Sequence, residues 1–170
     1  AVIAHEQIEQ SQWLASSLTH ENFKVYPLTD VNGVEISSAL KNVLAIGCGL
    51  ITGADLGENA RALYLTFGIQ ELIEFGQLLS SELETFLSPA GLGDIVLTCM
   101  SLTSRNMKYG YDFAKAQASK TPLPKDGPLA EGVMSVNTLL ALKEKHDVAL
   151  RTCTFVYDVL HNNQNIHKAF

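Results

Sequence analysis

The sequence predicts a mainly α-helical protein in which a multi-helical domain follows a short β-α-β unit. Residues 1–31 contain two short extended runs and one amphipathic segment, whereas from residue 32 onward apolar residues recur at helical spacing. Residues 33–50 are apolar around almost the whole circumference of a helix, which is typical of a helix buried inside a domain. Segments rich in Gly and Pro separate the helical stretches.

The composition is that of a soluble globular protein. Of its 170 residues, 46% are hydrophobic and 18% are charged, with a net charge of −6, so neither nucleic-acid binding nor disorder is predicted. Cys48, Cys99 and Cys153 have no close pair spacing, which predicts buried thiols in a reducing, cytoplasmic compartment. The longest apolar or glycine run, 43–51, is far short of the roughly 20 residues of a membrane span. The five histidines show no metal-ligand spacing, so we expect no metal site.

Residues 1–31 are expected to be the end of a parallel-sheet domain. Residues 1–4 predict a buried strand, 9–19 an amphipathic helix through Trp13, and 23–28 an alternating strand. Two strands cannot close a core of their own, so we expect this unit to belong to a larger sheet whose beginning is absent from the chain.

Residues 32–170 are expected to form one helical domain. Helices are predicted at about 33–50, 58–80, 81–87, 94–100, 104–118, 131–145 and 154–162. The connections at 52–57, 88–93 and 119–128 carry turn residues. The Asn- and Gln-rich run at 162–165 predicts a solvated, fraying end.

Lys41 stands in the middle of the apolar helix. On a helical projection it shares a face with small residues only, so its side chain would overlook a groove; these residues are Ser37, Ser38, Ala45 and Cys48. In one interpretation its ammonium reaches into water from the edge of the buried stripe. In the other it is a desolvated lysine that serves as a general acid or base. Periodicity alone leaves both open.

Asp94 marks a second candidate site. It follows Gly91-Leu92-Gly93 at a predicted helix start, with Thr98 one turn later, so a carboxylate favoured by the helix dipole would stand beside a backbone that a ligand can approach. An ordinary N-cap is the alternative. The glycines do not form a dinucleotide fingerprint, because Val96 stands where a third glycine is needed and no strand precedes them.

Ser104, Arg105 and Asn106 open the next predicted helix. A hydroxyl, a guanidinium and an amide beside free backbone N–H groups would seat a phosphate or a carboxylate. The alternative is a serine cap followed by a surface arginine. Glu131, before Gly132, would either cap a helix or accept hydrogen bonds from a ribose or an amide, and nothing local decides between these roles.

These stretches resemble the C-terminal domain of the bacterial NAD(P)-dependent glycerol-3-phosphate dehydrogenases, the dihydroxyacetone-phosphate reductases. The matching runs are Gly33-Val34-Glu35-Ile36, Ala39-Leu40-Lys41-Asn42-Val43, Asn59-Ala60-Arg61-Ala62, Ala90-Gly91-Leu92-Gly93-Asp94, Ser104-Arg105-Asn106 and Glu131-Gly132-Val133. They occur in the family's order over nearly the whole of residues 24–140. Two departures change the groove wall: Ser37-Ser38 replaces a glycine pair, and Ala54-Asp55-Leu56-Gly57 replaces a Leu-Gly-Phe-Gly loop.

The resemblance implies a helical substrate domain of the 6-phosphogluconate dehydrogenase C-terminal-like type at 32–170. Residues 1–31 would then be the remnant of an NAD(P)-binding Rossmann domain. The implied reaction interconverts dihydroxyacetone phosphate and sn-glycerol 3-phosphate with NAD(P), for glycerophospholipid synthesis in the cytoplasm, in a homo-oligomer.

The resemblance also assigns roles to single residues. Lys41 would be the catalytic lysine that exchanges a proton with the substrate oxygen. The substrate-binding residues would be Lys41, Asp94, Ser104, Arg105 and Asn106, the cofactor-binding residues Arg105, Leu129 and Glu131, and the supporting residues Asn42 and Thr98. Because the family's Gly-rich phosphate loop lies upstream, we expect this chain alone to hold half an active site, to be inactive and to self-associate through its exposed sheet edge.

Two other classes of function remain open at this point. One is another hydroxy-acid or sugar-phosphate dehydrogenase with the same helical domain, although the Ser104-Arg105-Asn106 run favours a phosphate. The other is a non-catalytic helical interaction domain, in which Lys41 would be replaceable without consequence. The preference for NADH or NADPH depends on residues of the upstream half.

Overall fold

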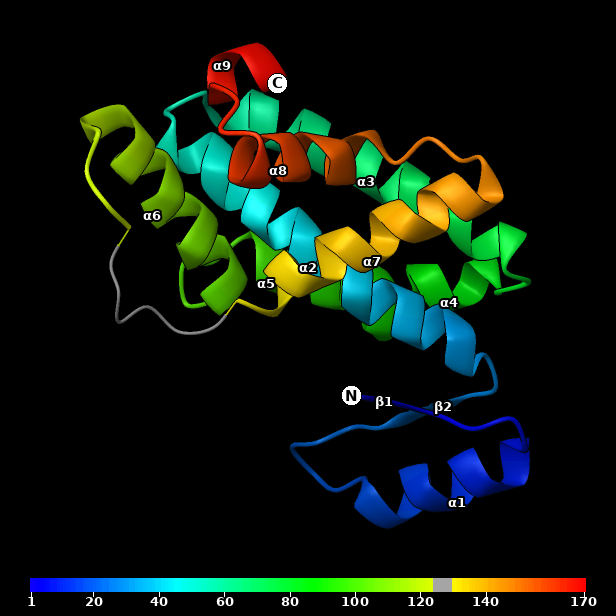
Figure 1. Ribbon diagram of the computed structural model, residues 1–170. Helices are drawn as coiled ribbons and strands as arrows, with labels where there is room; N and C mark the ends of the chain where they lie inside the picture. The colour runs from blue at the N-terminus through cyan, green and yellow to red at the C-terminus, as the bar shows by residue number, and fades with distance from the viewer. Residues whose placement is uncertain (124–129) are drawn as a thin grey trace.

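The computed structural model describes residues 1–123 and 130–170, and it is organised around one long helix, α2 (Figure 1). The helix α2 spans Val31–Gly53, and the helices packed around it are α3 (Glu58–Leu78), α6 (Arg105–Ser119), α7 (Glu131–His146) and α8 (Arg151–His161). The shorter elements are α4 (Leu83–Leu87), the π-helical turn η1 (Pro89–Gly93), α5 (Asp94–Cys99) and α9 (Ile166–Ala169). The predicted mainly α fold is confirmed.

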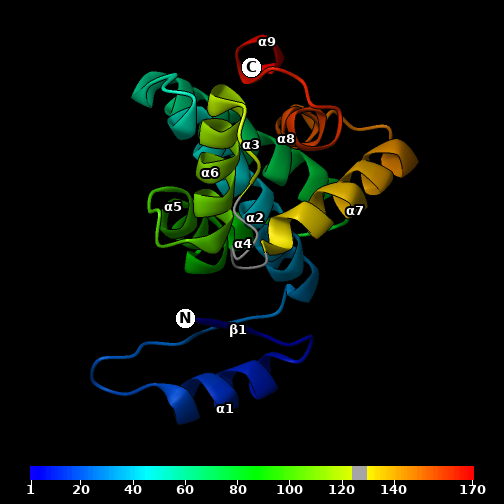
Figure 2. The same cartoon turned by 60° about the vertical axis from the view of Figure 1, so that its left-hand side comes forward.

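A β-α-β unit precedes the helices. Strands β1 (Val2–Ala4) and β2 (Tyr26–Leu28) pair in parallel, with Ile3 opposite Pro27, and α1 (Ile8–Leu18) is the crossover between them. Both views place this unit beyond the start of α2, at one end of the helical bundle (Figures 1 and 2). The predicted order of strand, helix and strand is therefore present.

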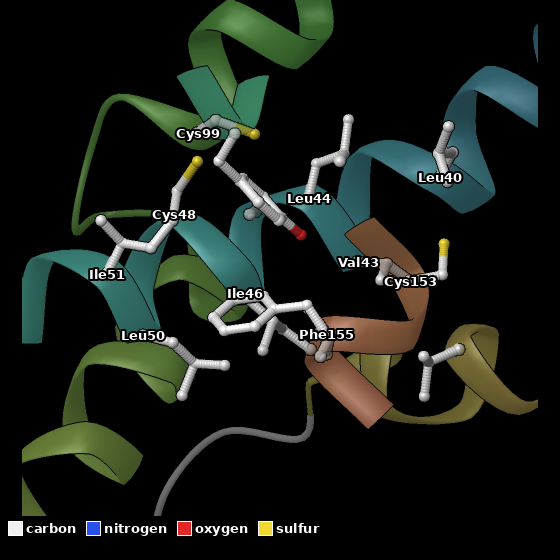
Figure 3. Close-up of a cluster of buried hydrophobic side chains, with 14 of the residues drawn as sticks. Leu40, Val43, Leu44, Ile46, Cys48, Leu50, Ile51, Cys99, Cys153 and Phe155 are labelled. Atoms are coloured by element: carbon white, nitrogen blue, oxygen red, sulfur yellow. The ribbon is translucent and has the colours of Figure 1, made fainter. Parts of the chain in front are cut away.

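The helix α2 forms the centre of the hydrophobic core because it offers no continuous polar face. Leu40, Val43, Leu44 and every residue from 45 to 51 are buried (Figure 3). All three cysteines are free and buried, as the sequence predicts. By length and composition α2 would also suffice to cross a membrane, but 67% of its apolar window is buried inside this protein, as in the core helix of a soluble domain.

Glycines bring the backbones of α2 and α6 into contact. A Cβ on Gly49 would lie less than 3.0 Å from the carbonyl oxygen of Met107, and a Cβ on Gly110 would lie equally close to the carbonyl oxygen of Ile46. No side chain therefore fits between the two helices at this crossing. Their close approach brings the first turn of α6 beside the middle of α2.

The second strand and the connection at 88–93 differ from the expectation. The strand β2 begins at Tyr26 instead of residue 23, because Phe23 forms an antiparallel bridge with His20 that ends the turn after α1. Residues 89–93, expected to be a loop, form η1, where the Ser88 hydroxyl accepts a hydrogen bond from the N–H of Ala90 over 3.1 Å.

The C-terminal end and α1 also differ from the expectation. Residues 162–165 are exposed, but the chain does not fray after them, because Asn165 caps α9 and Ile166 is buried. In α1 the buried residues are the small Ser11 and Ala15, whereas Trp13 is 67% exposed. The helix therefore packs on the sheet with a face of small residues, and its largest apolar side chain points to solvent.

Candidate active site

Lys41 and Asp94 form an ion pair between two helices. The Lys41 side chain leaves α2 at the edge of the core, is 19% exposed, and donates a hydrogen bond from Nζ to Oδ2 of Asp94. The Thr98 hydroxyl donates to the other carboxylate oxygen over 3.4 Å. Within 1–123 and 130–170, Asp94 is the one hydrogen-bond partner of the Lys41 ammonium, which has three donors, so two of them can meet a ligand.

The local fold explains how Asp94 reaches this position. The turn η1 folds back onto α4 at Gly91, where a Cβ would lie less than 3.0 Å from the carbonyl oxygen of Phe86. Asp94 then begins α5, where the helix dipole favours a carboxylate. At the other end of α5, the Cys99 thiol donates a weak hydrogen bond over 3.9 Å to the carbonyl oxygen of Lys41. The helix α5 is thus attached to α2 at the lysine itself.

A cavity of about 430 Å³ opens beside the ion pair. The predicted site residues that line it are Lys41, Asn42, Thr98, Ser104, Arg105, Asn106 and Glu131. Asp94 does not line this cavity itself but contacts Lys41, which does. Leu129 lies outside the described residues. Leu97 and Thr103 also line the cavity, and sequence reasoning missed both; their position between Asp94 and Arg105 was the one available signal.

Asn106 holds three helices together at the floor of this cavity. It is buried on α6, donates from Nδ2 to Oδ1 of Asn42 over 3.0 Å, and accepts the N–H of Gly132 at Oδ1 over 3.0 Å. The helix α7 has no side-chain cap from its own N-cap residue, so Asn106 takes that place. A Cβ on Gly132 would lie 2.6 Å from the carbonyl oxygen of Asn42, so glycine permits this approach. These contacts place the start of α7 at the cavity.

Arg105 and Glu131 meet at the cavity mouth. They are the first residues of α6 and α7, their side chains are 61% and 60% exposed, and a guanidinium nitrogen lies 3.2 Å from the carboxylate. The Ser104 hydroxyl caps α6 by accepting the N–H of Met107 over 3.4 Å. Two helix N-termini therefore converge where an anion would be stabilised. An exposed ion pair is weak, so the guanidinium is available to a ligand.

A second cavity, of about 550 Å³, lies between the start of β1 and η1. Its lining is largely apolar and consists of Ala1, Val2, Val34, Ser38, Pro89, Ala90, Gly93, Asp94 and Leu97. Ser38 and Leu97 line both cavities, so the two spaces adjoin at the Lys41–Asp94 pair. Ser37, which the helical projection placed on the same face, is instead fully buried. No cluster of His, Cys, Asp and Glu suited to a metal ion occurs in the part of the chain that the structure describes.

The chain is similar to known enzymes over nearly its whole length. The model of the family described as NAD-dependent glycerol-3-phosphate dehydrogenase C-terminus matches residues 30–170. A glycerol-3-phosphate dehydrogenase [NAD(P)+] of Mesoplasma florum is 38% identical over 162 residues, which are 95% of this chain and 48% of the relative. The corresponding enzyme of Ehrlichia ruminantium is 35% identical over 170 residues, with coverage of 99% and 52%.

Solved structures show the same similarity. The crystal structure of glycerol-3-phosphate dehydrogenase from Coxiella burnetii superposes with a TM-score of 0.88 at 32% identity, covering 99% of this chain and 52% of that one. The yeast enzyme superposes with a TM-score of 0.80 at 28% identity, with coverage of 93% and 46%. The chain thus spans about half the length of the curated relatives it matches.

Proposed function

Because this chain belongs to the family of NAD-dependent glycerol-3-phosphate dehydrogenase C-terminal domains, we propose that it is the substrate-binding half of such an enzyme. The proposed reaction interconverts dihydroxyacetone phosphate and sn-glycerol 3-phosphate with NAD(P). The observation that supports it most is the Lys41–Asp94 ion pair beside a cavity that Ser104 and Arg105 also line.

Lys41 carries the proton in this proposal. During ketone reduction its Nζ–H donates to the carbonyl oxygen of the substrate, and during alcohol oxidation the amine accepts the hydroxyl proton. Asp94 orients the amine, and Thr98 in turn orients Asp94. The substrate oxygen would be met by the donors of Nζ that Asp94 leaves unused.

The start of α6 binds the phosphate in this proposal. The Arg105 guanidinium matches two phosphate oxygens, and the Ser104 hydroxyl donates its own proton while it accepts the N–H of Met107. Asn106 has one amide hydrogen beyond the hydrogen bond to Asn42. The dipole of α6 adds to the attraction of the dianion.

The residues at the cavity mouth fit a nicotinamide dinucleotide. The Glu131 carboxylate is an acceptor for ribose hydroxyls, Arg105 is a donor for phosphate or carboxamide oxygens, and the adjoining cavity offers apolar walls to a flat ring. Leu129 is proposed for the same role from the resemblance alone. When bound, the cofactor supplies or takes the hydride.

The wider setting is part of the proposal. We assign residues 1–31 to the end of a Rossmann domain and 32–170 to the substrate domain of a cytoplasmic enzyme of glycerophospholipid synthesis without a membrane span. The β-α-β unit with two strands supports the first assignment, because such a unit is a fragment of a larger sheet. The exposed apolar residues of α1, Ile8, Trp13 and Leu18, support the expectation of a homo-oligomer.

The test uses the full-length enzyme and follows the absorbance of the reduced cofactor. Lys41→Met should lower kcat by roughly 10²- to 10⁴-fold with little change in cofactor affinity. Lys108→Met is the matched control, because Lys108 pairs with Asp112 on an exposed face of α6. A fall of less than about threefold for Lys41→Met would reduce Lys41 to a surface role. A carboxylate substrate that outcompetes the phosphate would overturn the phosphate assignment.

A further inference from the structure

Asp30 caps two helices with one carboxylate. It lies between β2 and α2, and its Oδ1 accepts the N–H of Gly33 over 2.7 Å at the start of α2. Its Oδ2 accepts the N–H of Glu82 over 2.8 Å at the start of α4. The side chain thus joins the start of α2 to Glu82, which lies 52 residues after Asp30 in the sequence.

The surroundings of Asp30 are shaped for a carboxylate. The buried hydroxyls of Ser81 and Thr85 lie close to it, without forming hydrogen bonds of good geometry. Burial by itself raises the pKa of Asp30, but the polar groups around the carboxylate, first of all the N–H groups of Glu82 and Gly33, together lower the pKa below its ordinary value. A Cβ on Gly33 would lie less than 3.0 Å from Oδ2, so glycine is what leaves room for this arrangement.

Both segments that Asp30 holds lead to the same ion pair. Lys41 lies on α2 about three turns after Asp30. The other segment runs from Glu82 through α4 and η1 to Asp94 at the start of α5. The two meet again in the Lys41–Asp94 ion pair and in the contact of Cys99 with the Lys41 carbonyl. The two segments are therefore joined at one end by Asp30 and at the other end by the Lys41–Asp94 ion pair.

We propose that Asp30 is a positioning residue that sets how Asp94 approaches Lys41, and thereby the direction of the Lys41 ammonium. The expected effect of Asp30 on catalysis rests on the proposed function, whereas the expected effect of Asp30 on the ion pair does not. Arg105 and its neighbours lie on α6, which packs against α2 through Gly49 and Gly110, away from Asp30. Binding of the substrate phosphate should therefore survive a change at Asp30 that impairs proton transfer.

Two variants weaken the Asp30 contacts in different ways. In Asp30→Asn one oxygen still accepts the N–H of Gly33, but the new amide group faces the N–H of Glu82, so that second hydrogen bond is lost. Gly33→Ala displaces the Asp30 carboxylate without removing it. Alanine favours a helix more than glycine does, so a weaker Lys41–Asp94 ion pair in this variant cannot come from helix propensity. Asn165→Ala is the control, because it removes a helix cap at α9.

The first readout is the ion pair itself, measured by NMR in this 170-residue chain. The side-chain Cε signal of Lys41 is assigned by its loss in Lys41→Met, and Asp94→Asn is then introduced into each background. We expect Asp94→Asn to move this signal in the wild type and in Asn165→Ala, but by less than about half as much in Asp30→Asn and Gly33→Ala. An equal response in all four backgrounds would overturn the proposal.

The second readout is kinetic and uses the full-length enzyme. Asp30→Asn should lower kcat about tenfold or more, while KM for the phosphorylated substrate stays within about twofold. A purely structural role would lower the melting temperature and leave kcat per folded site unchanged, and that result would also overturn the proposal. If the wild-type enzyme shows no dehydrogenase activity, the proposed function fails, and the NMR result still decides the role of Asp30.

Discussion

Replacing Glu71 by alanine would remove a buried carboxylate that stands at the start of another helix. Glu71 lies on α3 and is 6% exposed. Its carboxylate accepts the N–H of Arg151 over 2.7 Å and the N–H of Thr152 over 3.1 Å, and the Thr152 hydroxyl also donates to it. The N-cap residue of α8 supplies no cap from its own side chain, so Glu71 is the cap.

The expected loss follows from these contacts. Removing a helix cap costs about 0.5–2 kcal/mol. Leaving the buried donors of Thr152 unsatisfied costs about 1–3 kcal/mol, and the two contributions partly overlap. We therefore expect the free energy of unfolding to fall by about 3 kcal/mol. At roughly 2–4 °C per kcal/mol for a chain of this size, the melting temperature should fall by about 6–12 °C.

The assay is thermal and urea unfolding followed by far-UV circular dichroism. The matched control is Glu58→Ala, which removes the ion pair of an exposed glutamate with Arg61 on the same helix as Glu71. That loss should stay below about 1 kcal/mol. If Glu71→Ala cost no more than the control, the reasoning that α8 depends on a cap from α3 would be wrong.

Four further predictions concern the site and the pH dependence of stability. Arg105→Lys removes the bidentate fork, so in initial-rate measurements KM for the phosphorylated substrate should rise about tenfold, with a smaller change for an unphosphorylated analogue; equal changes would make Arg105 structural. Glu131→Gln releases Arg105 from an exposed ion pair, so KM for the phosphorylated substrate should fall by up to about fivefold. The Kd of the cofactor should rise, because Glu131 is proposed to bind it. An unchanged KM together with an unchanged Kd would contradict this prediction. Burial raises the pKa of Glu71 above its ordinary 4.5, so its contribution to stability is complete below that value and is lost as the pH rises through the folded-state pKa. In Glu71→Gln the free energy of unfolding should decline less steeply with rising pH. An unchanged slope would mean that other groups cause the decline. The purified chain alone should show no turnover, because it holds half of the proposed site, and measurable turnover would refute that division.

The central helix could be predicted from the sequence because its apolar periodicity extends over many turns. Local patterns also located Asp94 and Ser104 at helix starts, where the structure has them. Periodicity could not show that Lys41 and Asp94 meet, since they are 53 residues apart and the contact depends on how η1 folds back. The resemblance to a family placed both residues at the substrate, as an expectation.

Caps supplied from a distant part of the chain were invisible in the sequence. Asn106 caps α7, and Glu71 caps α8 from across the core, which is why α8 begins at Arg151 and not at 154 as expected. The helix α9 was missed because one buried residue, Ile166, holds a short segment that is otherwise polar. For α8 and α9 the deciding contact is tertiary, whereas the start of α7 at Glu131 agrees with the prediction.

The backbone contact between α2 and α6 fixes the distance between Lys41 and Arg105 in the proposed site. Lys41 lies about 12 Å along α2 before Gly49, and Arg105 about 7.5 Å along α6 before Gly110. Where side chains separate two helices, the spacing changes whenever those side chains change. Here main-chain atoms meet directly, so we expect the distance between Lys41 and Arg105 to depend little on the side chains of the surrounding core. We expect this fixed distance to exclude a substrate that is one carbon longer or shorter. With its phosphate bound at Arg105, the carbonyl group of such a substrate would not lie beside Lys41.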